Sequence, residues 1–158
     1  MTTLEAAPST RAHSRTFTYR SSTEWLGRRR GQLSATGREP FVVASPPEFR
    51  GESGVWTPEE LFLGAIDSCL MITFAAMVEK YHLPVEGYFS EVTGTLEATD
   101  GHYRFTRVTI KPTILITERS AAEKTLEALD RAHRDCLITN SVTPAVVLEP
   151  DVEMAVAE

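Results

Sequence analysis

The residues best suited to covalent chemistry are the only two cysteines, Cys69 and Cys136. The thiolate form of cysteine is the nucleophile, and an unperturbed thiol is only a few per cent ionised near neutral pH. Cys69 lies in an apolar stretch, where burial would raise its pKa, so a reactive Cys69 needs a cation from elsewhere in the chain. The run Arg28–Arg30 is one source of that cation, and a solvated turn is the competing interpretation of these arginines.

Two inert thiols are the simplest alternative to a redox pair, because free cysteine often behaves as a small buried hydrophobe. In a reducing compartment a structural disulfide is not expected, and a transient or catalytic disulfide is the main alternative to two free thiols. His133 and Cys136 are spaced three residues apart, but no CxxC or HExxH motif accompanies them. We therefore predict no metal site and no cofactor.

The composition is that of an ordinary soluble protein: 158 residues, 42% hydrophobic, 24% charged and a formal net charge of −6. The acidic balance argues against nucleic acid as a partner. No signal-peptide pattern is visible at the N-terminus, so we expect a cytoplasmic protein. The apolar run Leu61–Val78 is interrupted by polar residues and flanked by charges, which favours a core helix over a membrane span.

The N-terminal third is predicted to contain short strands. Residues 1–14 are polar and aperiodic and are expected to form a flexible arm, which leaves 15–158 as a single domain. Three strand-like segments follow, at 16–20, 31–36 and 40–45, and their close spacing predicts an antiparallel meander. The Pro-, Gly- and Ser-rich stretch 45–54 is predicted to be a loop.

A long helix is predicted from Thr57 to about Tyr81. Thr57 is placed to cap it, Pro58 takes the first helical position, and Glu60 completes a capping box. Between Leu61 and Val78 the helix is apolar nearly all round, which predicts protein on most of its sides. A chain of this size has difficulty surrounding such a helix, and a partner subunit would solve that problem.

The second half of the chain predicts a hairpin, a helix and one or two final strands. Asp100-Gly101 is a tight-turn dipeptide between two strand patterns, and Pro112 predicts an edge or a bulge in the second strand. Ser120 and Glu123 form a second possible capping box, before an amphipathic helix that reaches Cys136. The order of elements predicts an α+β fold with helices against antiparallel sheets.

The two cysteines and their surroundings together resemble the OsmC/Ohr family, the osmotically inducible and organic hydroperoxide resistance proteins. "TPEELFLGAIDSCLMITF" carries Pro58, Glu59 and Cys69, and "AHRDCLITNSV" carries His133 and Cys136. The likeness extends through "SPPEFRG" and over nearly the whole chain from residue 16. It departs at Leu137, where many members have proline, which suggests a less studied branch.

The resemblance implies an OsmC-like α+β fold, an intertwined homodimer and a cysteine-based peroxidase. Cys69 would be the peroxidatic cysteine and Cys136 the resolving one. The family's catalytic arginine falls on Arg28, or on Arg29 if one residue is inserted, and its arginine-orienting glutamate falls on Glu59. The implied partners are an organic hydroperoxide and a dithiol reductant, which would be a lipoyl group, a thioredoxin-like protein or a small thiol.

Two other functions remain open on the residues alone: a non-catalytic module that binds a small apolar ligand, and an interaction domain with spectator thiols. One geometric point also needs an answer. Glu59 and Cys69 are ten residues apart, so a straight helix separates them by ~15 Å. They could share an arginine only if the helix is bent or broken, for instance near Gly64, or if the arginine reaches in from another strand or subunit. Asp67 would raise the pKa of the thiol if it faced inward.

Overall fold

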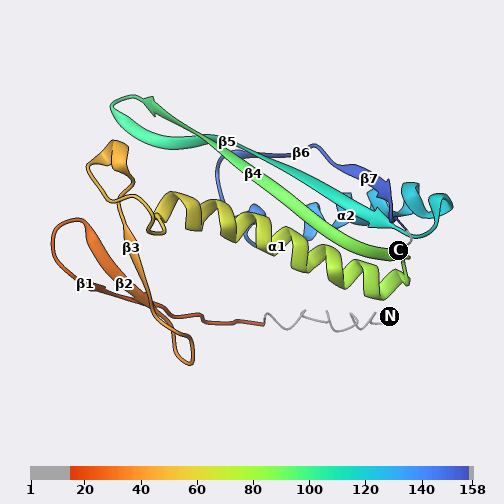
Figure 1. The fold of residues 1–158 in the computed structure, drawn as a ribbon, viewed down its shortest axis with the longest axis horizontal. Coiled ribbons are helices and arrows are strands. Elements are labelled where there is room, and N and C mark those ends of the chain that lie inside the picture. The colour runs from red at the N-terminus through yellow and green to blue at the C-terminus, as the bar shows by residue number, and fades with distance from the viewer. Residues whose placement is uncertain (1–14, 157–158) are drawn as a thin grey trace, which may run out of the picture. The chain divides into compact units, whose positions relative to one another are not determined.

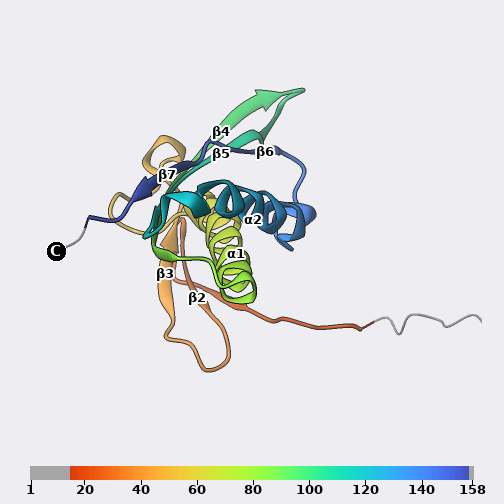
Figure 2. The same cartoon turned by 90° about the vertical axis from the view of Figure 1, so that its right-hand side faces the viewer.

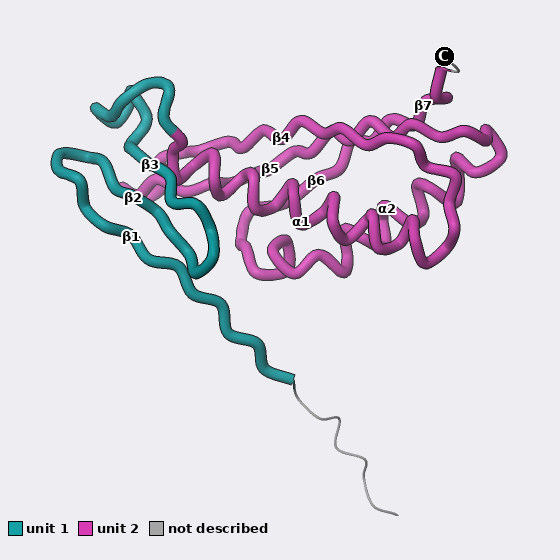
Figure 3. Tube along the Cα trace, turned by 60° about the horizontal axis from the view of Figure 1, so that its bottom comes forward, with its two compact units in different colours: residues 1–55 teal, residues 56–158 magenta. Residues whose placement is uncertain are grey.

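The computed structural model describes residues 15–156, which lie in two compact units, residues 1–55 and 56–158 (Figure 3). Each unit is described by itself below. The predicted arm at 1–14 lies outside the described residues, and the single domain from residue 15 stays a prediction.

The first unit is built on a three-stranded antiparallel meander, which confirms the expected organisation. Its strands are β1 (Ser22–Trp25), β2 (Arg30–Ser34) and β3 (Phe41–Ala44), in that order across the sheet. The strand predicted at 16–20 is wrong, because 15–21 form no strand. On its β1 side the short strand β2 pairs only with residues 22–25. No part of β2 therefore lies opposite the alternating segment 16–20. The predicted loop contains one turn of 3-10 helix, Pro47–Phe49.

The second unit begins with helix α1 (Pro58–Tyr81), which confirms the predicted helix and its cap. The Thr57 hydroxyl accepts a hydrogen bond from the Glu60 amide at 3.2 Å, and the Glu60 carboxylate accepts one from the Thr57 amide at 2.9 Å. At the other end His82 adopts the left-handed conformation that closes a helix. The helix is uninterrupted between these caps.

A four-stranded mixed sheet packs against α1. Strands β4 (Val85–Thr99) and β5 (His102–Ile116) form the predicted antiparallel hairpin. The two final strands, β6 (Ala145–Leu148) and β7 (Asp151–Met154), run parallel to β5 and follow one another along its free side. Pro112 lies where β5 has left β6 and has not yet met β7. A residue without a backbone N–H is therefore tolerated in a central strand, because that side is locally an edge.

Helix α2 (Ala122–Asp135) follows a 3-10 turn, Arg119–Ala121. The predicted capping box at Ser120 and Glu123 is wrong. The 3-10 turn puts Ala121 in the cap position, in a helical backbone conformation and with no side-chain cap, so Ser120 lies one residue too early.

Both helices lie on one face of the sheet, as seen in the ribbon and in its end-on view (Figures 1 and 2). The alternate β5 residues that face them are buried, and so are one stripe of α1 and one stripe of α2. Gly94 of β4 lets α1 approach the sheet closely, because a Cβ there would lie 2.6 Å from the Leu63 side chain. The core members are Ile66, Leu70, Phe74, Val108, Ile110, Ile114, Ile116, Ala128, Leu129 and Ala132.

The chain buries only one stripe of α1. The sequence predicts protein on most sides of this helix, and this chain alone does not supply it. Of all helices in the described residues, α1 is the one long and apolar enough to cross a membrane, a test that a soluble core helix also passes. A continuous stripe on its other side is exposed, at the spacing of one helical face. The exposed stripe consists of Gly64, Ala65, Ser68, Met71, Ile72, Ala75 and Ala76.

Candidate active site

Cys69 lies near the middle of α1, between the buried core stripe and the exposed stripe, and is half-buried. Its neighbour Leu70 is fully buried in the core and thereby fixes the rotation of the helix about its axis. One turn later, the Thr73 hydroxyl donates a hydrogen bond to the Cys69 carbonyl oxygen at 2.8 Å. The Cys69 side chain is thus held at the boundary between core and surface.

Cys136 ends α2 and begins the next turn. It is fully buried and has an extended backbone, and the Asn140 amide donates to its carbonyl oxygen at 3.0 Å. An extended residue before such a turn presents its side chain to the amides two and three residues ahead, as in a helix cap. The Ile138 and Thr139 amides accordingly lower the pKa of Cys136.

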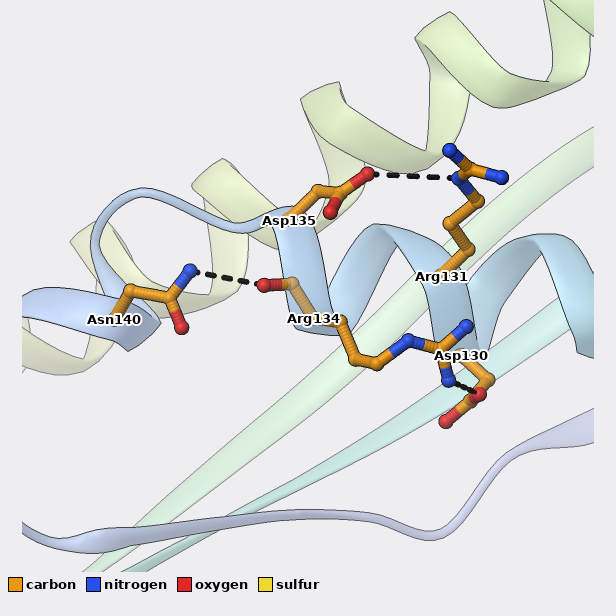
Figure 4. A network of polar contacts seen from close by, with 5 residues as sticks. All are labelled: Asp130, Arg131, Arg134, Asp135 and Asn140. Atoms are coloured by element: carbon orange, nitrogen blue, oxygen red, sulfur yellow. Dashed lines mark hydrogen bonds and ion pairs between the residues drawn. The ribbon is translucent and has the colours of Figure 1, made fainter.

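The turn after Cys136 is tied back to α2 by a side chain. The side-chain amide nitrogen of Asn140 (Nδ2) donates to the Arg134 backbone carbonyl oxygen at 2.9 Å, as Figure 4 shows. The same view shows two ion pairs along the helix, Arg131 with Asp135 at 3.6 Å and Arg134 with Asp130. These pairs are solvent-exposed and stabilise the helix little. The Asn140 bond satisfies a carbonyl at the helix end and so fixes the turn that carries Cys136.

The structure brings Cys69 and Cys136 together, although 67 positions separate them in the sequence. Both are free thiols, and each sulfur shifts the pKa of the other, so the two side chains are neighbours. The Ile138 amide acts on both sulfurs and lowers the pKa of each. Two neighbouring thiols can form a disulfide once their sulfurs approach to bonding distance.

The two thiols have opposite electrostatic environments. Burial raises the pKa of Cys69, and the neighbouring Cys136 sulfur raises it further. The Ile138 amide lowers this pKa, but by less than the other two effects raise it. Burial also raises the pKa of Cys136, but the Thr139 hydroxyl and amide, the Cys69 thiol and the Ile138 amide together bring that pKa below its ordinary value. The Thr139 hydroxyl has no regular hydrogen-bond partner among the described residues, so it acts on the sulfur as a nearby dipole. Unit 2 by itself therefore favours the proton on Cys69 and the negative charge on Cys136.

The run Arg28–Arg30 lies in the β1–β2 turn and at the start of β2. These three arginines line a cavity of about 400 Å³ together with Arg50 and Glu52. The Arg29 guanidinium donates to the Phe49 carbonyl oxygen, and Arg30 pairs with Glu52 at 3.4 Å. Arg28 has a left-handed backbone (φ 50°), and within residues 15–156 its guanidinium has no hydrogen-bond or ion-pair partner. Of the three arginines, Arg28 is the one whose charge is still available. Its approach to Cys69 stays a prediction.

Glu59 lies in the first turn of α1. One of its carboxylate oxygens is buried and has no hydrogen-bond partner in the described part of the chain. A buried carboxylate oxygen without a donor is costly, so the position suits a cation or donor from outside unit 2. Because α1 is unbroken past Gly64, Glu59 and Cys69 remain ~15 Å apart along it. A shared arginine would have to bridge them from another strand or subunit.

Asp67 does not act on the Cys69 thiol. Its carboxylate accepts a hydrogen bond from the Ser90 hydroxyl of β4 at 2.7 Å. Tyr88, also on β4, packs against Phe74 with ring centroids 5.6 Å apart, and burial raises the pKa of its hydroxyl. Asp67 therefore anchors α1 to the sheet, and the sequence-based concern about a like charge at the thiol does not apply.

Two features of the site are not apparent from the sequence. The donors at Cys136 come from Ile138 and Thr139, and the only signal is a hydroxyl three residues after the cysteine. The exposure of the apolar residues near the thiols is the second feature. Leu70 is a core residue, whereas Ile72 and Leu137 are 63% and 73% exposed. Among the described residues, no cluster of three or more His, Cys, Asp or Glu side chains could hold a metal ion.

Comparison with known proteins places this arrangement in a family. A family model described as OsmC-like protein matches residues 51–151, and the chain belongs to that family. The fold is similar to that of an OsmC-like protein of unknown function from Vibrio cholerae, with a TM-score of 0.78, 22% identity and coverage of 85% of this chain and 99% of the other.

A second solved structure is an organic hydroperoxide resistance protein OsmC from Legionella pneumophila, with a TM-score of 0.70, 22% identity and coverage of 89% and 99%. The uncharacterized protein YmaD of Bacillus subtilis is 26% identical over 110 residues, which is 68% of this chain and 73% of that protein. These comparisons confirm the OsmC-like α+β fold and the family resemblance.

The two environments predict an order of ionisation that can be measured without the arginine. In an Arg28→Ala variant we expect Cys136 to ionise below the ordinary thiol pKa of 9.0 and Cys69 above it, because only Cys136 gains net stabilisation from its donors. NMR of the protein with ¹³C-labelled cysteine Cβ atoms would follow both thiols as the pH is raised. Cys69→Ser and Cys136→Ser, each combined with Arg28→Ala, assign the two steps. Ionisation of Cys69 first in Arg28→Ala would contradict this description.

Proposed function

We propose that this protein is a thiol-dependent peroxidase that reduces organic hydroperoxides in the cytoplasm. The observation that carries the proposal is that Cys69 and Cys136, the only two cysteines of the chain, are neighbours within an OsmC-like fold. A pair of spectator thiols has no need of three polar donors aimed at one sulfur. Relatives of this fold include organic hydroperoxide resistance proteins, which supports the choice of substrate class.

The first step is nucleophilic attack by the Cys69 thiolate on the O–O bond. Unit 2 raises the pKa of Cys69, so the thiolate requires a cation, and Arg28 is the guanidinium with no partner of its own in residues 15–156. Its charge would stabilise the thiolate and donate hydrogen bonds to the peroxide oxygens. The distal peroxide oxygen becomes the hydroxyl of a Cys69 sulfenic acid, and the alkoxide leaves and takes up a proton to become an alcohol.

The second step forms the disulfide. Cys136, which carries the stabilised negative charge, attacks the Cys69 sulfur and releases the sulfenic oxygen as water after protonation. The thiol contact keeps this reaction ahead of irreversible over-oxidation. A dithiol reductant then restores both thiols by exchange. Exposed Ile72 and Leu137 beside the thiols favour an organic substrate over hydrogen peroxide.

We also propose that the active protein is a homodimer. The exposed stripe of α1 is apolar and consists mostly of small residues, which allow close packing of a second helix. Several bulky apolar side chains are exposed elsewhere, among them Trp25 at 76% and Trp56 at 58%. Such exposure in a single chain is typical of a surface that a partner covers.

The cysteine variants test the peroxidase. With tert-butyl hydroperoxide and a dithiol, Cys69→Ser should reduce peroxide consumption to the uncatalysed rate, because the nucleophile is lost. With the dithiol left out, Cys136→Ser should complete one rapid turnover and then stop, and excess peroxide should convert Cys69 to sulfinic acid in the mass spectrum. Unchanged consumption by Cys69→Ser would contradict the proposal and favour a binding module, and equal rates for hydrogen peroxide would contradict the substrate class.

The arginine assignment has a matched control two residues away, at Arg30. Arg28→Ala should lower kcat/KM by about 10²-fold or more, the usual loss when a charge-stabilising donor is removed. Arg30→Ala should retain most activity, because Arg30 is engaged with Glu52. Steady-state kinetics of both variants decides the question. A larger loss in Arg30→Ala than in Arg28→Ala would show that the assignment is wrong.

The dimer is tested by a charge on the exposed stripe. Ala75→Glu should convert the protein from twice the chain mass of 17.5 kDa to the monomer mass in sedimentation equilibrium, because an unpaired carboxylate would be buried at the interface. Ala98→Glu, at an exposed alanine of β4, is the control and should remain dimeric. A wild-type protein that sediments as a monomer would contradict the dimer.

A further inference from the structure

The two sulfurs of the site differ in accessibility. Cys136 has no exposed surface, whereas Cys69 is half-buried on the rim of α1. Thiol–disulfide exchange requires the incoming thiolate to approach the attacked sulfur in line with the bond that breaks, so access selects the sulfur.

The two sulfurs also differ in how well each carries a negative charge after the disulfide breaks. The Thr139 and Ile138 amides and the Thr139 hydroxyl all act on the Cys136 sulfur. The Cys69 sulfur has the Ile138 amide near it and the Thr73 hydroxyl, whose proton goes to the Cys69 carbonyl oxygen, and burial outweighs both. A sulfur that is better stabilised as thiolate leaves faster. Accessibility and leaving ability therefore point to the same direction of exchange.

We propose that the reductant attacks the Cys69 sulfur and that Cys136 leaves, with Thr139 as the positioning residue that speeds its departure. The proposal rests on the proposed function, because it concerns the disulfide which that function produces. It assigns an order to the recovery step: the mixed disulfide with the reductant forms on α1, at the half-buried cysteine, and never on the buried turn after α2.

The step balances with a dithiol as the two-electron donor. The first reductant thiolate forms a bond to the Cys69 sulfur, the Cys69–Cys136 bond breaks, and its electron pair goes to Cys136. The second reductant thiol, after losing its proton to solvent, attacks the reductant's own sulfur in the mixed disulfide. This releases Cys69 as thiolate and leaves the reductant as a cyclic disulfide. Both protein thiols are restored.

Mapping of the mixed disulfide tests the direction. The full-length protein is oxidised with diamide, treated briefly with excess 2-mercaptoethanol, quenched with acid and alkylated with N-ethylmaleimide. We expect mercaptoethanol on Cys69 and maleimide on Cys136 in the peptide mass spectrum, and an adduct mainly on Cys136 would overturn the proposal. Because diamide replaces peroxide, a protein that fails as a peroxidase but forms the disulfide still gives a decisive map. Absence of the disulfide would overturn both proposals.

A pair of threonine variants tests the role of Thr139. Each sulfur has one hydroxyl near it, so Thr139→Val and Thr73→Val are matched losses on the two sides of the disulfide. If Cys136 leaves, reduction by dithiothreitol should be about three-fold slower in Thr139→Val than in Thr73→Val, because only the first removes stabilisation of the leaving thiolate. The reverse ratio, or equal rates, would overturn the assignment. Circular dichroism melts of both oxidised variants identify any loss of folding.

Discussion

The packing of α1 through one narrow stripe is the constraint on which the second unit depends. Ile66, Leu70 and Phe74 are fully or almost fully buried against β5 and α2, and they fix both the position and the rotation of the helix. The Asp67–Ser90 bond fixes the same rotation from the neighbouring face. Cys69 follows from this packing, because the residue beside a core position must lie at the edge of the buried stripe. A rotated helix would carry the thiol into the core or into solvent.

The partner thiol depends on a different kind of restraint. Cys136 closes α2 and opens the following turn, so its sulfur meets backbone amides that no helix hydrogen bond uses. Asn140 binds that turn to the carbonyl of Arg134 and keeps the amides in place. The Ile138 amide lowers the pKa of both thiols. It therefore stabilises the negative charge on whichever sulfur is the thiolate. Thr139 adds to the asymmetry between the thiols, because its hydroxyl and amide act on Cys136, whereas the hydroxyl that acts on Cys69 is that of Thr73.

Local signals in the sequence were sufficient for much of this fold. The capping box at Thr57, the hairpin turn at Asp100 and the family motif around the two cysteines each depend on residues close in sequence. The failures came where the backbone around a segment, and not its own side-chain pattern, decides the outcome. The alternating segment at 16–20 forms no strand because β2 is too short to reach it, and Ser120 caps nothing because a 3-10 turn shifts the helix start. The donors at Cys136 were missed because they are backbone amides, which every residue except proline carries.

Three side chains in the described residues lack a charge partner that one of the others could supply. Glu59 has a buried carboxylate oxygen without a donor, Arg28 has a guanidinium without an acceptor, and Cys69 has a raised pKa that only a cation can lower. A single guanidinium could satisfy both acids only by bridging ~15 Å of an unbroken helix. The proposed dimer matters for that reason, since a second subunit is one place from which such an arginine could reach the helix. A subunit that covers the exposed stripe of α1 would also lower the dielectric beside the site, which strengthens the attraction between a guanidinium and a thiolate, so assembly and catalysis would draw on the same charge pair.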